Sequence, residues 1–260
     1  MIADYRAMGA RLSLRHVPIF AIFTACAVIA LAQDLFAQGP SRTVRPREAL
    51  STGSVQEGKR LLESGRYALA IRHFSAAIRR GDAPAEVYKL RGKAFDKSGV
   101  PSRAIKDYSR SIELNPSDSE TYILRGDARV LNHEYEAAVS DYSNAIKSAP
   151  RSQEAYLGRG LAYTGMAKYD EAIKDYQWVL KIKPRSPEAL LNMGRACMLA
   201  GRSLEAMTYL EKALEVETSP KWRQKIQEWM DELLKDPGRA RKKAPEPGVR
   251  PVPSTPGKYW

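Results

Sequence analysis

One set of charged residues recurs at a regular spacing that suits an ion pair. Three evenly spaced arginines are each followed, at the same distance along the chain, by an aspartate. The segment before them has Glu57 and His73 at these positions, and the segment after them has Met193 and Tyr209. Such a pair can bind a charged ligand or connect two helices by an ion pair. Because both residues are replaced together in the end segments, we favour the connection between helices. The expected pairs are Arg91–Asp107, Arg125–Asp141 and Arg159–Asp175.

Residue types that carry catalysis or bind metal ions form no recognisable site in the sequence. The three histidines, His16, His73 and His133, are far apart, and no C-x-x-C, H-E-x-x-H, G-x-S-x-G or phosphate-loop pattern is present. Of the two cysteines, Cys26 lies in an apolar N-terminal stretch. Cleavage of that stretch from the chain would leave Cys197 without a disulfide partner. We therefore expect a protein that is not an enzyme, with no catalytic residue, metal, cofactor or small-molecule substrate.

A repeated sequence unit accounts for the spacing of these charges. The pattern A-[IV]-x-x-[FY]-x-x-[AS]-I begins at Ala70, Ala104 and Ala138, and looser copies begin at Ala172 and Ala206. A glycine precedes each copy at a constant distance. Because glycine and alanine are small, two helices can approach closely there, and the aromatic residue fills the space beside them. The glycines are Gly58, Gly92, Gly126, Gly160 and Gly194, and the aromatic slot holds Phe74, Tyr108, Tyr142, Tyr176 and Leu210.

This unit resembles the tetratricopeptide repeat, a helix–turn–helix motif of about 34 residues. The resemblance implies an all-α fold, a right-handed superhelical α-solenoid of five repeats, whose first helices line a concave surface that binds protein segments. Helix-start signals include a capping box at Ser117-x-x-Glu120 and a serine cap, Ser186, before Pro187. The five units are expected at 51–84, 85–118, 119–152, 153–186 and 187–220.

One more amphipathic helix is expected at 221–235, as a cap on the last repeat. Trp222, Ile226, Trp229 and Leu233 form a single apolar stripe on it. A terminal repeat needs such a one-sided cover, although two tryptophans are also compatible with a partner site. The following segment, 236–260, is rich in proline and basic residues and is expected to be a disordered tail.

The N-terminal sequence is typical of a secretory signal peptide. A segment with three arginines precedes an uncharged stretch, 17–32, which ends in the cleavage motif Ala30-Leu31-Ala32. We expect a signal peptide at 1–32, a flexible linker at 33–50 and export to the periplasm. The alternative is an uncleaved signal that anchors the chain in the inner membrane, although a span usually needs about 20 residues.

The resemblance also indicates which residues would line the concave surface. Positions 2, 5, 9 and 12 of each first helix give it a basic N-terminal half and a mostly apolar C-terminal half. Contiguous apolar residues favour a groove for a protein or peptide, and packing against the next unit is the alternative. The candidate groove residues are Lys59, Lys89, Lys93, Ile123, Asp127, Val130, Leu157, Leu161, Leu191, Arg195 and Met198.

The formal net charge of +12 is unevenly placed, and the repeats are closer to balance than the chain ends. This argues against repeats built mainly to hold nucleic acid. The leading interpretation is a non-enzymatic, exported adaptor or scaffold that binds a protein segment in its groove during cell-envelope assembly or regulation. The alternative is electrostatic binding of an anionic polymer, lipid surface or nucleic acid by the lysine-rich N-terminal repeats and the tail. The tail residues concerned are Arg239, Arg241, Lys242 and Lys243.

Overall fold

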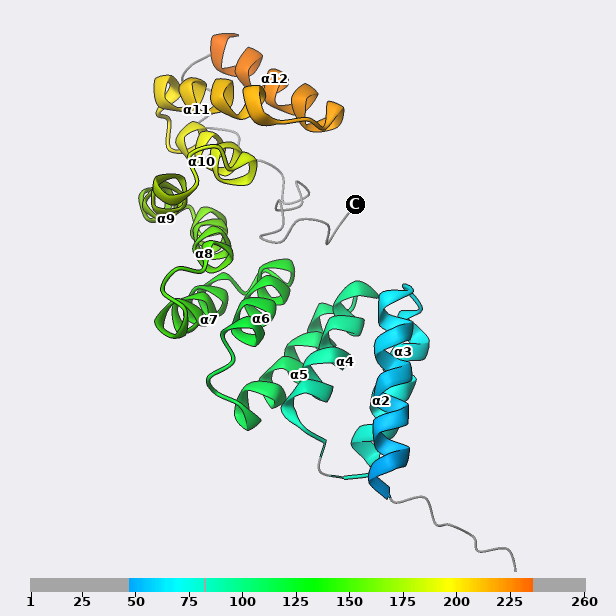
Figure 1. Cartoon of the computed structure of the whole chain (residues 1–260). Coiled ribbons are helices and arrows are strands. Elements are labelled where there is room, and N and C mark those ends of the chain that lie inside the picture. Colours follow the sequence, from blue (N-terminus) through cyan, green and yellow to red (C-terminus); the bar gives the residue numbers. More distant parts are fainter. Residues whose placement is uncertain (1–46, 82, 236–260) are drawn as a thin grey trace, which may run out of the picture. The chain divides into compact units, whose positions relative to one another are not determined.

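The computed structural model describes residues 47–81 and 83–235, which form a succession of antiparallel helix pairs (Figure 1). This part of the chain contains eleven helices and no strand. The expected signal peptide and tail lie outside it. The helices are α2 (Arg47–Glu63), α3 (Tyr67–Arg79), α4 (Ala85–Lys97), α5 (Pro101–Leu114), α6 (Ser119–Leu131), α7 (Tyr135–Ser148), α8 (Gln153–Gly165), α9 (Tyr169–Ile182), α10 (Pro187–Leu199), α11 (Ser203–Val216) and α12 (Pro220–Lys235).

Neighbouring helix pairs pack on one another as an α-solenoid does. Within a repeat the first helix packs on the second, as α4 does on α5, and each second helix also contacts the first helix of the next repeat. The first helices of neighbouring repeats touch as well, α4 with α6, α6 with α8 and α8 with α10. The all-α solenoid expected from the repeat is therefore confirmed.

The glycine of each repeat lies against the residue in its aromatic slot. A Cβ atom added at Gly92 would lie 2.6 Å from Cε1 of Tyr108, and one at Gly126 would lie 2.8 Å from Cε1 of Tyr142. Contacts this short leave no room for a side chain, because protein interiors are close-packed. Tyr142 also fills the space beside Gly158 of the next repeat, so a single ring packs against two first helices.

Polar caps start several of the first helices, and one differs from the sequence expectation. The capping box at Ser117 is wrong, because the N-cap of α6 is Asp118, whose carboxylate accepts hydrogen bonds from the backbone N–H groups of Glu120 and Thr121. Ser117 instead donates to the side chain of Asn115. The cap expected at Ser186 is confirmed, since its hydroxyl accepts a hydrogen bond from the N–H of Ala189.

The first helix begins earlier than the sequence suggested. We expected a flexible linker to residue 50, but α2 already begins at Arg47. Glu48, Ala49 and Leu50 are good helix formers, so the helix extends back into the end of the expected linker.

The C-terminal helix covers the last repeat with its apolar side. Ile226, Trp229 and Leu233 are buried and belong to the same hydrophobic cluster as residues of α10 and α11, whereas Leu234 is 72% exposed. Trp222 and Met230 pack against the edge of this cluster. The apolar stripe expected on this helix therefore lies where a cap on the fifth repeat requires it.

Across residues 47–81 and 83–235, no helix combines the length and the apolar character needed to cross a bilayer.

Candidate partner-binding site

The three expected arginine–aspartate pairs are present as bidentate ion pairs. In the middle one, Nε and Nη2 of Arg125 lie 3.0 and 2.7 Å from the carboxylate oxygens of Asp141. The corresponding distances are both 2.7 Å for Arg91 and Asp107, and 2.9 and 2.8 Å for Arg159 and Asp175. Each pair joins the two helices of one repeat. Hydrogen bonding to Asp175 raises the pKa of Arg159, which favours its charged form.

Each arginine also has a second partner, a serine, which the sequence analysis missed. Nη1 of Arg91 donates to the hydroxyl of Ser75, Arg125 to Ser109 and Arg159 to Ser143, at 3.0 to 3.2 Å. Each serine belongs to the second helix of the preceding repeat. The arginine therefore connects two repeats. We call each serine–arginine–aspartate set a clamp. The signal was available in the sequence, because a serine lies 16 residues before each of the three arginines.

The middle clamp contains a second arginine. Nη1 of Arg129 lies 2.6 Å from Oδ2 of Asp141, and it also donates to the backbone carbonyl of Ala137. The side chain of Asp141 is only 1% exposed. One buried carboxylate thus neutralises two half-buried guanidinium groups, from Arg125 and Arg129.

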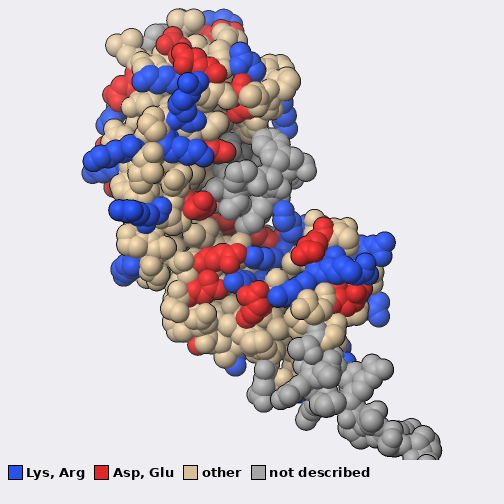
Figure 2. Space-filling view, in the orientation of Figure 1, with Lys and Arg blue, Asp and Glu red and all other residues tan. Residues whose placement is uncertain are grey.

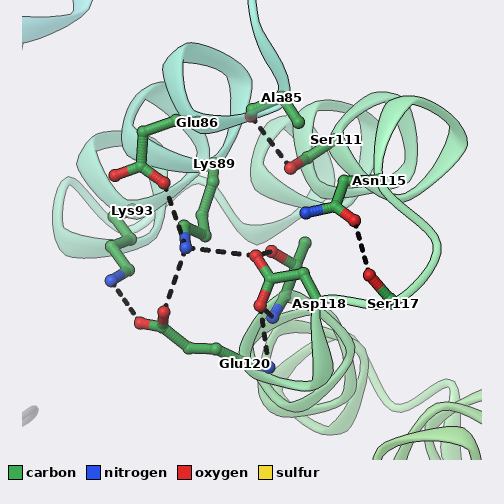
Figure 3. A network of polar contacts seen from close by, with 10 residues as sticks. Ala85, Glu86, Lys89, Lys93, Ser111, Asn115, Ser117, Asp118 and Glu120 are labelled. Atoms are coloured by element: carbon green, nitrogen blue, oxygen red, sulfur yellow. Dashed lines mark hydrogen bonds and ion pairs between the residues drawn. The ribbon is translucent and has the colours of Figure 1, made fainter. Parts of the chain in front are cut away.

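A second polar network lies on the first helices of repeats two and three (Figure 3). Lys89 of α4 points toward α6, where its Nζ lies 3.1 Å from Asp118 and 3.0 Å from Glu120. It also pairs with Glu86 on its own helix. Lys93, one turn further along α4, lies 2.6 Å from Glu120. This network connects α4 with α6, the first helices of repeats two and three. Like the clamps, it therefore links neighbouring repeats.

Ion pairing outweighs burial in setting the protonation of this network. Burial lowers the pKa of Lys89, but hydrogen bonds to Glu120, Glu86 and Asp118 raise it above its ordinary value. Burial raises the pKa of Glu120, yet hydrogen bonds from Lys93 and Lys89 hold it below the usual range. Because the folded carboxylate pKa is depressed, its stabilising contribution is present at neutral pH and is lost as the pH falls through that pKa.

The basic N-terminal half of the expected groove is therefore largely neutralised. Lys89 and Lys93 were expected to line the groove, and the carboxylate of Glu120 in the next repeat pairs with both. Figure 2 shows acidic and basic side chains interleaved over this part of the molecule. Glu120 lies in the first turn of α6, and it was expected only as part of a helix cap.

A pocket of about 530 Å³ lies next to this network, and the first helices of repeats one to four contribute to its lining. Its walls combine aliphatic and aromatic side chains with charges of both signs. Such mixed concave sites bind a partner by an apolar anchor and orient it by a few polar groups. The pocket is lined by Leu62, Glu63, Tyr67, Lys93, Asp96, Lys97, Tyr108, Ser119, Glu120, Ile123, Leu124 and Glu154.

Two of the candidate groove residues, Lys93 and Ile123, line this pocket. Asp127 serves a structural purpose, because it accepts a hydrogen bond of 2.8 Å from the hydroxyl of Tyr142. Val130 is buried in a core cluster, and Lys59 is half-buried on α2.

The apolar C-terminal half of the expected groove is mostly core. Leu157, Leu191 and Met198 are 8%, 3% and 7% exposed and belong to the largest hydrophobic cluster. Met198 was expected to line the groove, but its side chain is buried in the core. The reason is that α10 is apolar on nearly every side and packs between neighbouring helices. Leu161 is half-buried.

Arg195 lies on α10, where its guanidinium is largely buried, and burial lowers its pKa. Its Nε has no hydrogen-bond partner among the residues that the structure describes. No group of histidine, cysteine, aspartate and glutamate side chains suited to a metal ion occurs in the described part of the chain.

These helix pairs define a repeat protein of the α-solenoid class, built to present an extended surface. Models of the tetratricopeptide repeat match residues 55–119, 123–165, 154–186 and 187–219. The chain belongs to the tetratricopeptide repeat family. Proteins of this family generally bind other proteins, and their folds are typically non-catalytic scaffolds.

Solved structures of similar fold include two of MamA and one of pilF. A crystal structure of MamA protein is 28% identical, with a TM-score of 0.60, and the match covers 65% of this chain and 92% of that one. MamA 41-end from Desulfovibrio magneticus RS-1 is 20% identical, with a TM-score of 0.61 and coverage of 64% and 94%. Pseudomonas aeruginosa pilF is 16% identical, with a TM-score of 0.60 and coverage of 76% and 90%. The last two show the fold alone. No curated protein matches the sequence significantly.

Proposed function

We propose that this protein is a non-enzymatic scaffold that binds a segment of a partner protein in the pocket lined by repeats one to four. The observation that carries the proposal is the pocket itself, whose lining combines apolar side chains with charges of both signs, mainly from first helices. Family membership supports it, because tetratricopeptide repeat proteins generally bind protein partners. The apolar side chains of Leu62, Ile123 and Leu124 would receive one aliphatic or aromatic side chain of the segment.

The charges of the pocket favour a cationic segment. Its walls hold four carboxylates, from Glu63, Asp96, Glu120 and Glu154, against the two ammonium groups of Lys93 and Lys97. Since Lys93 already pairs with Glu120, the excess of negative charge remains on the walls. A lysine or arginine beside the apolar anchor would complement it, and an acidic segment would be repelled.

Exchange of two exposed carboxylates of the pocket, Glu63 and Glu154, tests the site. Variants Glu63→Lys and Glu154→Lys, combined, are expected to reduce binding of peptides that carry an apolar residue flanked by lysine or arginine at least tenfold. The measurement is retention on a peptide array, followed by titration of the retained peptides. The matched control is Glu136→Lys with Glu171→Lys, which changes two exposed carboxylates on second helices by the same charge.

A photo-reactive residue at position 123 gives an independent readout in the native host. Cross-linked products are expected from position 123 and not from position 106, an exposed site on α5. Equal products from both positions, or peptide binding that the control variant weakens equally, would show that the pocket is not the binding site.

We further propose that the chain is exported, with cleavage between Ala32 and Gln33. The support is the basic segment, the short apolar stretch and the A-x-A motif, all of which precede the described residues. N-terminal sequencing of the protein from its host is expected to begin at Gln33. A full-length protein that resists extraction from membranes at high pH would instead establish the uncleaved anchor.

A further inference from the structure

Two neighbouring turns between repeats carry cations that have no acidic partner. Lys147 and Arg151 flank the turn from α7 to α8, and Lys181, Lys183 and Arg185 flank the turn from α9 to α10. All five side chains are exposed, and within residues 47–81 and 83–235 none of them forms an ion pair. We call these five residues the basic edge. Figure 2 shows lysine and arginine side chains predominating over α9 and its neighbours, at the left of the view.

The basic edge is confined to repeats three and four. Lys147 and Lys181 occupy the same position of these two repeats, and in repeats two and five this position holds Glu113 and Glu215. A charged surface that serves only solubility does not require cations at this position in repeats three and four and carboxylates at it in repeats two and five. Successive turns of a solenoid lie along one edge, so the five cations form a single positive area bounded by carboxylates on both sides.

An aliphatic side chain projects from the middle of this area. Ile182 lies between Lys181 and Lys183 and is 49% exposed. One turn earlier on α9, the half-buried Trp178 stacks on Tyr156, with ring centroids 3.7 Å apart. That stacking covers one face of the indole, which makes it a poor platform for a nucleic-acid base. Lysines around an exposed aliphatic residue instead suit the boundary between lipid headgroups and acyl chains.

We propose that the basic edge binds the surface of a bilayer that contains anionic lipids. The five cations are attracted by the negative surface potential, and Ile182 enters the headgroup region once the protein is bound. This surface is formed by the ends of the second helices, whereas the proposed peptide pocket lies between the first helices. A protein bound to a membrane through its basic edge can therefore hold a partner segment at the same time.

Vesicle binding of charge-reversal variants tests the proposal. The full chain is mixed with vesicles of phosphatidylglycerol and phosphatidylcholine, or of phosphatidylcholine alone, and the bound fraction is measured by co-sedimentation. The triple variant Lys181→Glu, Lys183→Glu and Arg185→Glu is expected to bind the anionic vesicles at least tenfold more weakly. Ile182→Ser is expected to weaken binding about threefold, and salt should weaken binding of the unaltered chain.

The matched control is the triple variant Arg72→Glu, Arg103→Glu and Lys106→Glu. These residues are exposed on α3 and α5, and the control changes the net charge by the same amount. It is expected to retain vesicle binding, with a helical circular dichroism signal equal to that of the other triple variant. Equal loss in both triple variants would overturn the proposal, as would equal binding to neutral vesicles. Binding to duplex DNA that the first triple variant abolishes, without any vesicle binding, would assign the edge to nucleic acid instead.

Discussion

Replacing Asp141 with asparagine is expected to lower the free energy of unfolding by about 3–5 kcal/mol. Because asparagine has nearly the same shape as aspartate, the decrease in the free energy of unfolding measures the effect of removing the charge. Without that charge, the guanidinium groups of Arg125 and Arg129 remain 15% and 19% exposed and lose their shared counter-charge. Removing one partner of a buried ion pair leaves the other desolvated and unpaired, which costs more than the pair itself contributes. Urea unfolding followed by circular dichroism measures the effect.

The control is an ion pair that is equally short but exposed. Arg110 and Glu113 lie 2.8 Å apart with side chains 53% and 63% exposed. Because water screens such a pair, Glu113→Gln is expected to change the stability by less than about 1 kcal/mol. A double-mutant cycle between Arg125 and Asp141 should add a coupling energy of more than about 1 kcal/mol. Similar effects of Asp141→Asn and Glu113→Gln would refute the importance of the clamp.

The second large effect is expected at the cap of the last repeat. Ile226→Ala should destabilise the protein by about 2–4 kcal/mol, because its side chain is fully buried in the cluster that α12 shares with α10 and α11. Leu234→Ala, on the same helix, removes a side chain that is 72% exposed and should cost less than about 0.5 kcal/mol. Hydrogen exchange should show the loss of protection concentrated in α10 to α12, since each repeat contacts only its neighbours. If Ile226→Ala leaves both stability and exchange unchanged, α12 is not a structural cap.

The sequence predicted the periodic part of this structure well, because each repeat obeys the same packing rules. Close approach of glycine and aromatic slots, as at Gly92 and Tyr108, follows from residue size and spacing alone. The arginine–aspartate pairs were also visible, because both partners lie in one repeat and are replaced together at the ends.

Contacts between different repeats were harder to predict. Lys89 and Glu120 are 31 residues apart, and only the stacking geometry decides that they meet. Glu120 was interpreted as part of a helix cap, which concealed its use as a counter-ion. The burial of Leu191 and Met198 was missed for a related reason: a position on the first-helix side is exposed in one repeat and covered in the next, depending on how the neighbouring helices pack.

The clamps also bear on how such a chain can grow or shrink in evolution. Each clamp arginine reaches 16 residues back to a serine and 16 residues forward to an aspartate, so a deletion inside a middle repeat would separate it from one of its partners. Loss of one complete unit, residues 119–152, would instead bring Arg159 into register with Ser109 while it keeps Asp175. The clamp contacts therefore require that the length of the chain changes by whole repeats. Duplication or loss of a whole repeat preserves these contacts, whereas an insertion or deletion of part of a repeat breaks them.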